Sequence, residues 1–240
     1  MQSQVQEKFS EYYERWISLQ EANIYQLLSV SRDSENEQEH KSLVSKVLNL
    51  HKEYYTMKWA GAHNDVLGFF SPTWLTPLEN AHIWITGWKP SIVYKLINSL
   101  RRAQLIPGSS LANLSEEQLK KIEKLKLKTR LEEEKLDREV ERQQVSVADR
   151  KIVELARLSG HVREHLERSV EANRLVDIAV NTLLAGLEKV MKTADCVRLK
   201  TMKEVLEVLT PLQCVDFMAA SLMIQIQLRN WGKKRDCRKI

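Results

Sequence analysis

Apolar residues recur every three or four positions along almost the whole chain, and few glycines or prolines interrupt them. This spacing places the apolar side chains on one face of an α-helix. The 240 residues include only 7 glycines and 5 prolines, roughly 3% and 2% against about 7% and 5% in average proteins. A turn-rich sandwich or barrel is therefore disfavoured. We predict an all-α fold, a multi-helix bundle formed by a single domain over residues 1–240.

Polar stretches and prolines divide the first half of the chain into segments. Apolar spacing predicts a helix over about residues 6–28, a loop over 31–40, and a second helix that begins near residue 43 and runs past Trp59. Thr76 directly precedes a proline, so it can cap a short helix from Leu78 to Trp84. The clearest break in the chain is the connector over residues 107–113, because it opens with a Pro-Gly-Ser-Ser run.

The pattern changes after this connector. Ser115 followed by Gln118 is a capping box that opens a helix. Residues 116–151 contain eleven basic and ten acidic side chains, and polar residues interrupt the apolar seam, which is too thin for a strong coiled coil. We therefore expect one long, highly charged helix that protrudes from the bundle.

The last third of the chain completes the bundle. Three apolar stripes with helical spacing lie over residues 152–170, 176–190 and 197–208. Thr210 and Pro211 then cap a final helix that is apolar nearly all round. We predict that this helix is central and buried, and that Cys214 within it is an inert thiol.

The net charge of +5 is unevenly distributed. Residues 1–40 hold three basic and eight acidic side chains, a net charge of −5, whereas residues 233–240 form a basic tail with five basic side chains and one acidic one. This tail is either a candidate nuclear address or simply a solvated end. Its basic residues are Lys233, Lys234, Arg235, Arg238 and Lys239. A basic face spread over the molecule is not evident, so direct DNA binding is not the default expectation.

The expected location is the nucleus or the cytoplasm. No apolar run approaches the roughly 18 to 20 residues of a membrane span, and polar residues follow Met1 where a signal peptide has an apolar core. The three cysteines are an odd number without CxxC spacing, which indicates reduced thiols.

One histidine motif is the only sequence feature that resembles a metal-binding site. His161, Glu164 and His165 fit the H-x-x-E-H pattern of inverted zinc peptidases. Charged neighbours and the lack of a third-ligand motif favour an exposed helical face instead, so we expect no metal. His63 and His82 lie near aromatic residues in the sequence, and we expect them to be buried and hydrogen-bonded.

Aromatic residues provide the only candidate pocket. Trp74, Trp84 and Trp88 are close in the sequence and either wall a pocket for a hydrophobic ligand or pack in the core. Phosphate-binding glycine loops and the serine-hydrolase elbow are absent from the sequence. We therefore expect no catalytic residues, no enzymatic activity and no cofactor.

The order of several short motifs is more specific than any one of them. They are Phe9…Tyr13-x-x-Trp16, Tyr54-Tyr55, Phe70-Ser71-Pro72-x-Trp74, Leu78-Glu79, Trp84-x-x-Gly87-Trp88-x-Pro90, Leu114-Ser115-x-x-Gln118, Leu209-Thr210-Pro211-x-Gln213 and Trp231-Gly232. In this order the chain resembles the plant delay-of-germination (seed dormancy) domain family over residues 7–236. The same domain forms the carboxy-terminal regulatory half of TGA-type bZIP transcription factors. The resemblance implies an all-helical regulatory domain, classed through its TGA relatives with sequence-specific DNA binding and transcription.

The resemblance also implies a partner. In the dormancy regulators, an acidic-x-Tyr-x-x-Trp segment of the first helix looks like a docking site for clade A type 2C protein phosphatases. Glu11, Tyr13 and Trp16 match that segment here. A helix that presents Tyr and Trp one turn apart is a reasonable groove-binding anchor, and the alternative is that both rings pack inward. We expect a non-enzymatic plant regulator that acts through protein–protein interaction, with a phosphatase or a transcription complex, in dormancy, abscisic-acid or developmental control.

Two other functions stay open at this point. One is a transcription regulator that binds DNA itself, although the chain begins with an acidic helix where TGA factors place a basic region and a leucine zipper. The other is a sensor of haem or of a small hydrophobic ligand. Family haem binding implies histidines in the final helix, whereas no histidine follows His165, and Gln225 and Arg229 lie near the place where these histidines are expected. TGA relatives can also enclose a fatty acyl chain, which apolar helices would permit. The oligomeric state is open.

Overall fold

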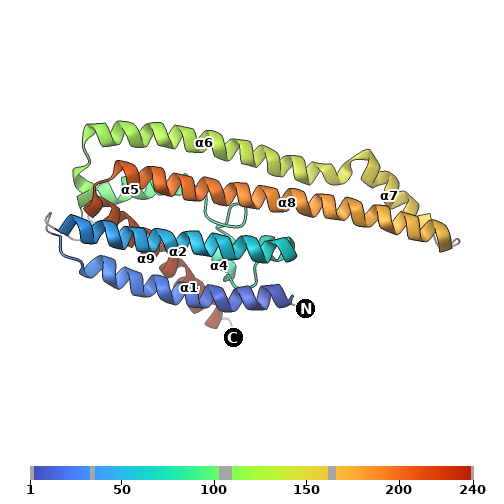
Figure 1. The fold of residues 1–240 in the computed structure, drawn as a ribbon, viewed down its shortest axis with the longest axis horizontal. Helices are drawn as coiled ribbons and strands as arrows, with labels where there is room; N and C mark the ends of the chain where they lie inside the picture. The colour runs from blue at the N-terminus through green and yellow to red at the C-terminus, as the bar shows by residue number, and fades with distance from the viewer. Residues whose placement is uncertain (1–2, 33–35, 103–109, 162–165, 239–240) are drawn as a thin grey trace.

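The computed structural model describes residues 3–32, 36–102, 110–161 and 166–238, with side chains outside residues 158–173. These residues form an elongated helical bundle (Figure 1). Its α-helices are α1 (Gln4–Ser29), α2 (Glu37–Asn64), α3 (Val66–Phe70), α4 (Pro77–Asn80), α5 (Ile92–Arg102), α6 (Glu116–Val145), α7 (Arg150–His161), α8 (Leu166–Val208) and α9 (Pro211–Cys237). Two short 3₁₀ segments are η2 (Ser110–Asn113) and η3 (Ser146–Ala148). The described residues include no strand, so the predicted all-α fold is confirmed.

Capping boxes begin several of these helices, at Ser115 where the sequence predicts a capping box and at Thr76 and Thr210 where it predicts a helix cap. At α4, α6 and α9 the side chains of Thr76, Ser115 and Thr210 each accept a hydrogen bond from the backbone three residues later. In each case the Glu or Gln at that position bonds back to the capping residue. Two otherwise unpaired amide donors are thus satisfied at each helix start. The capping box of α1 is formed by Ser3 and Gln6.

The long helices lie roughly along the longest axis of the molecule, and α9 crosses behind α1 and α2 (Figure 1). The charged helix α6 packs along α8, and two ion pairs join them, Lys128 to Glu204 at 2.5 Å and Lys200 to Glu132 at 2.6 Å. The far end of α6, helix α7 and the beginning of α8 extend past the ends of α1 and α2 (Figure 1). The protruding charged helix is therefore confirmed, with α8 as its support.

Two apolar clusters form the core. The larger one surrounds α9, and its fully buried members include Phe217, Met218 and Leu222. The smaller one is aromatic and joins α1, α2 and α3 to the segment before α4. The predicted central position of the last helix is confirmed, and Cys214 is buried there with a pKa raised by burial to about 12. No helix in the described part of the chain combines the length and the apolarity that a membrane span requires.

Several predicted boundaries are wrong. Residues 37–40 of the expected loop begin α2, where Glu37 and Glu39 favour the positive end of the helix dipole. The short helix from Thr76 ends at Asn80 instead of Trp84, because the side chain of Asn80 bonds back to the carbonyls of Pro72 and Leu75.

The end of the chain also differs from the prediction. The two stripes over 176–190 and 197–208 belong to one uninterrupted helix, α8, since no proline stands between them. Residues 233–237 of the expected basic tail continue α9, and residues 110–113 of the expected connector form a 3₁₀ turn.

Candidate functional site

The first helix has two opposite faces. Its buried stripe repeats at intervals of three and four residues from Phe9 to Leu27 and includes Tyr13 and Trp16, each 3% exposed. Glu11 lies on the exposed side. Residues two positions apart on an α-helix are rotated by about 200° around the helix axis, so their side chains point to nearly opposite sides. The three residues predicted to bind a partner therefore do not form one surface in this structure.

The two rings are core side chains. Trp16 packs against Tyr54 with ring centroids 4.7 Å apart, and against Tyr13 at 5.8 Å. Phe9 extends the same cluster to Trp74 at 4.8 Å. Aromatic pairs at such spacings add to the stability gained from burial alone. The inward packing that the sequence analysis named as the alternative is the arrangement found here.

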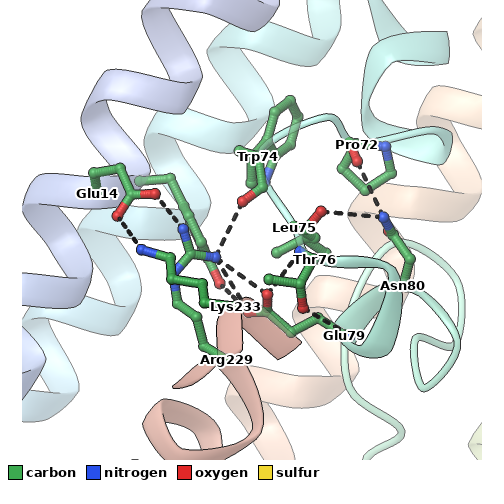
Figure 2. A network of polar contacts seen from close by, with 10 residues as sticks. Glu14, Pro72, Trp74, Leu75, Thr76, Glu79, Asn80, Arg229 and Lys233 are labelled. Atoms are coloured by element: carbon green, nitrogen blue, oxygen red, sulfur yellow. Dashed lines mark hydrogen bonds and ion pairs between the residues drawn. The ribbon is translucent and has the colours of Figure 1, made fainter. Parts of the chain in front are cut away.

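Arg229 of α9 lies beside this aromatic cluster and ties three segments together (Figure 2). It is 3% exposed and donates to the backbone carbonyl of Trp74 at 3.0 Å and to the Glu79 carboxylate at 3.2 Å. It also pairs with Glu14 of α1, which Lys233 approaches at 3.4 Å from the solvent side. Sequence patterns do not reveal this cluster, because its members are up to 219 residues apart.

Tyr13 completes the Arg229 cluster. Its hydroxyl donates to the Glu79 carboxylate at 3.4 Å, and the Arg229 guanidinium lies 5.0 Å from its ring centre. Burial raises the pKa of the Tyr13 phenol, so the ring stays neutral. Close packing of α9 on the Thr76 segment requires a glycine, since a Cβ at Gly232 would lie 2.2 Å from the Thr76 hydroxyl oxygen. This cluster holds α1 in place, and of the exposed outer face of the helix it engages Glu14.

The three predicted pocket tryptophans lie in different surroundings. Trp74 is buried against Phe9, and Trp88 packs on the large cluster around α9. Trp84 donates from its indole nitrogen to Asp137 of α6 at 2.6 Å. None of the three lines either of the main cavities among the described residues. Trp74 and Trp88 therefore pack in the core, the second of the two alternatives that the sequence left open.

A strained turn follows α4. Trp84 and Gly87 exchange two backbone hydrogen bonds, at 2.6 and 3.2 Å. Between them Ile85 and Thr86 have φ values of 41° and 60°, which β-branched residues rarely adopt because of steric clash. Such strain persists only where surrounding contacts enforce it. A Cβ at Gly87 would lie 2.9 Å from the guanidinium of Arg198, so glycine lets this arginine approach the turn.

Two buried cations enforce the turn. Arg198 of α8 donates to three carbonyl oxygens, two on the turn and that of Trp88, at 2.5 to 2.8 Å. Lys58 of α2 donates to the carbonyl and hydroxyl oxygens of Thr86 at 3.0 and 2.9 Å. The Asp195 carboxylate pairs with both, at 2.5 and 2.9 Å. Burial lowers the pKa of the Lys58 ammonium to about 8, which Asp195 opposes and Arg198 reinforces.

The predicted burial of His63 and His82 is wrong, although the Nδ1 of His82 does lie 2.9 Å from the carbonyl oxygen of Leu78, and two other histidines are buried instead. His63 and His82 are exposed. His40 is 2% exposed and its Nε2 lies 2.7 Å from the carbonyl of Ser31. His51 lies beside Trp16, and burial lowers its pKa. Both buried rings lie on the inner face of α2. Assigning each position of this helix to its buried or its exposed face would have identified them from the sequence.

No group of three or more potential ligands for a metal occurs among the residues that the structure describes. Of the H-x-x-E-H motif, Glu164 and His165 and the side chain of His161 lie outside the described part. The helix α9 contains no histidine, and Arg229, near the place where the resemblance implies a haem ligand, is paired with carboxylates. The α9 residues therefore do not fit haem ligation.

The basic residues at the carboxy-terminal end are partly neutralised. Lys233 approaches Glu14 and Arg235 pairs with Asp236 at 2.7 Å. Lys234 and Arg238 are exposed. Lys239 lies outside the described residues. These side chains form the end of a helix and not a broad basic face of the kind that tracks a DNA backbone.

Comparison with known proteins confirms the resemblance of the motifs. The family model described as "DOG1: Seed dormancy control" matches residues 23–99. The chain is 48% identical over 236 residues to "Protein DOG1-like 4" of Arabidopsis thaliana, covering 98% of this chain and 96% of that relative. It is 29% identical to "Protein RESPONSE TO ABA AND SALT 1" of the same plant, over 95% of this chain and 96% of the relative.

A more distant match links the chain to transcription factors. It is 27% identical to "Transcription factor TGA2.3" of Oryza sativa subsp. japonica, over 85% of this chain and 57% of that factor. The extent and identity of the DOG1-like 4 match place the sequence in one family. The chain belongs to the DOG1-like family, to which TGA transcription factors are related.

Proposed function

We propose that this protein is a non-enzymatic regulator that acts by binding other proteins in the control of seed dormancy or of the response to abscisic acid. The description of the matching family model and the name of the relative RESPONSE TO ABA AND SALT 1 support this role. The relation to a TGA factor supports action in transcription complexes in the nucleus.

The observation that carries the proposal is the outer face of α1. Along this face one stripe of positions, spaced alternately by four and three residues, is exposed from end to end. Its members are Glu7, Glu11, Glu14, Ser18, Glu21, Tyr25 and Leu28. Tyr25 is 75% exposed and Leu28 is 42% exposed. The stripe thus combines an acidic run with an apolar end.

This face suits a partner with the complementary chemistry, basic side chains next to an apolar depression. We assign it to a type 2C protein phosphatase, the partner implied by the resemblance of Glu11 and its neighbours. Charged residues would guide the encounter, and Tyr25 would provide the buried anchor that dominates the energy of many interfaces. Tyr13 and Trp16 act by positioning the helix, since both are buried in the aromatic cluster.

The test is capture of a purified clade A type 2C phosphatase by the full chain. Glu11→Lys combined with Glu21→Lys, and separately Tyr25→Ser, should each weaken binding at least tenfold, about 1.4 kcal/mol. All three residues are exposed, so melting temperature and helical circular dichroism should stay unchanged. Trp16→Phe keeps a ring in the core and should bind normally.

The matched control is Glu134→Lys with Glu141→Lys, the same charge change on exposed positions of α6. It should leave phosphatase binding intact. Equal binding by the outer-face variants and the wild type would overturn the proposal, as would equal loss in the α6 control, which would mean that only net charge matters.

A further inference from the structure

A concave cleft of about 590 Å³ lies between α5 and α6. Five cationic side chains line it, namely Lys89, Lys95, Arg102, Lys126 and Arg130. They come from both walls, the segment leading into α5 with α5 itself on one side and α6 on the other. Ser91, Asn98 and Ser99 add polar groups between the charges.

Most of this positive charge is not compensated within the described chain. The side chains of Lys95, Arg102 and Arg130 have no ion pair or hydrogen bond with any other described residue, and Lys89 approaches its carboxylate, Asp137, only at 3.8 Å. Lys126 alone has a close partner, Glu123 at 2.8 Å. Convergence of like charges raises the energy of the folded chain unless counterions or a ligand offset it.

The charges of α6 are sorted by face. Toward α8, Lys128 and Glu132 both form short ion pairs with that helix. Toward α5, the cations face the cleft, and the nearby carboxylate of Glu133 is buried, accepting a hydrogen bond from the Ser91 amide at 2.6 Å. A helix that served only as a solvated surface would not require this separation.

The walls are held in place before any ligand arrives. Besides the contact between Glu133 and Ser91, the hydroxyl of Tyr94, which lines the cleft, bonds to that of Thr129 in α6 at 2.8 Å, and both residues are buried. Preformed geometry reduces the entropy lost on binding. The volume is in the range of small-molecule sites.

We propose that this cleft binds a small molecule that carries two or more phosphate groups. Arginine and lysine donate charge-assisted hydrogen bonds to phosphate oxygens, and arginine does so in pairs. Five cations within one cleft match a multiply charged anion better than a single carboxylate. A nucleotide and an inositol polyphosphate share this chemistry. The inference rests on the cleft alone and is independent of the docking face on α1.

Titration calorimetry of the full chain at near-physiological salt tests the proposal, with inositol hexakisphosphate, ATP and inorganic phosphate as separate probes. We expect binding of at least one of the first two and much weaker binding of inorganic phosphate. Binding of the inositol phosphate alone would assign a densely phosphorylated ring, and binding of ATP alone would assign a nucleotide. Failure of both probes to bind up to millimolar concentration would overturn the proposal.

Variants distinguish binding at a defined site from general electrostatic attraction of an anion to a basic protein. Lys95→Gln with Arg130→Gln should reduce affinity at least tenfold, whereas Lys95→Arg with Arg130→Lys should retain it. The matched control is Lys120→Gln with Lys124→Gln, two exposed cations of α6 that do not line the cleft. Circular dichroism confirms the fold of each. Equal loss of affinity in the control would contradict a defined site.

Discussion

Arg198 and Arg229 are both buried arginines of the last two helices, yet their charges are balanced in different ways. Arg198 and Lys58 share one carboxylate, Asp195, and all three side chains are at most 2% exposed. Arg229 pairs with two carboxylates, Glu79 and Glu14, and Glu14 is 50% exposed. Water therefore screens part of the second cluster and none of the first.

The difference indicates what each cluster does. The Asp195 cluster has one cation in excess, and carbonyl oxygens of the strained turn take the place of the missing carboxylate. The turn and the cluster therefore depend on each other. The Arg229 cluster is balanced by carboxylates and seals the outer edge of the aromatic core, so it can lose a rim charge at little cost.

The largest effect is expected for Asp195→Asn. It leaves Lys58 and Arg198 buried without an anion, and loss of one partner of a buried pair costs about 3 to 5 kcal/mol. Urea unfolding measures the loss. The matched change in the other cluster, Glu14→Gln, should cost less than about 1 kcal/mol because the side chain is half exposed. Similar losses in the two variants would refute the contrast.

The second effect is expected for Arg229→Met. Removal of the guanidinium leaves the buried carboxylate of Glu79 with fewer donors, so the free energy of unfolding should fall by about 2 to 3 kcal/mol. Lys233→Met, at the exposed rim, is the control and should change it by about 0.5 kcal/mol or less. An unchanged free energy of unfolding in Arg229→Met would show that the cluster does not stabilise the outer edge of the aromatic core.

The third effect is the pH dependence that Lys58 of the Asp195 cluster contributes to stability. Because burial lowers the pKa of Lys58 to about 8, the unfolded chain binds more protons than the folded one between that pH and the ordinary lysine value. Stability from this group therefore rises with pH in that window. One pKa unit corresponds to about 1.4 kcal/mol, so we expect a gain on the order of 2 kcal/mol between pH 7.5 and 9.5.

The control for this prediction is Lys58→Met, compared with the wild type at each pH by urea unfolding. Burial raises the pKa values of Cys214, Tyr54 and Tyr55, and their contributions fall as pH rises past their ordinary values. These contributions are common to both proteins and cancel in the difference. A difference that stays constant from pH 7.5 to 9.5 would contradict the depressed lysine pKa.

The smallest effect is expected at the turn itself. Ile85→Gly removes a β-branched residue from a positive φ, and relief of such strain is worth about 1 kcal/mol or more. We expect a net stabilisation of about 1 kcal/mol in thermal or urea unfolding. Ile83→Gly, at a position without positive φ, should instead destabilise the protein. Destabilisation of equal size at both positions would mean that the turn is not strained.

Local sequence signals predicted the helices well. Capping boxes at Thr76, Ser115 and Thr210 act between residues three positions apart, so the sequence contains all of their geometry. Apolar periodicity also identified the buried stripe of α1, since the positions of Tyr13 and Trp16 on that stripe follow from spacing alone. A family motif then drew attention to Glu11, which lies on the opposite face.

The same signals did not predict what distant segments bring together. The turn over residues 84–87 is shaped by cations from α2 and α8, and no pattern near it indicates a positive φ at Ile85. Likewise the cleft between α5 and α6 collects its cations from separate helices. Charge counted along the chain showed only the acidic amino end and the basic carboxy end.

The sequence by itself determined the all-α class, the helix starts, the central last helix and the membership of the DOG1-like family, because periodicity, capping and motif order are properties of neighbouring residues. Only the tertiary structure decided which charges are buried together, which distant aromatic rings pack against one another and which cations line one cleft. Burial and ion pairing depend on distances between residues far apart in the chain, and a linear pattern does not contain those distances.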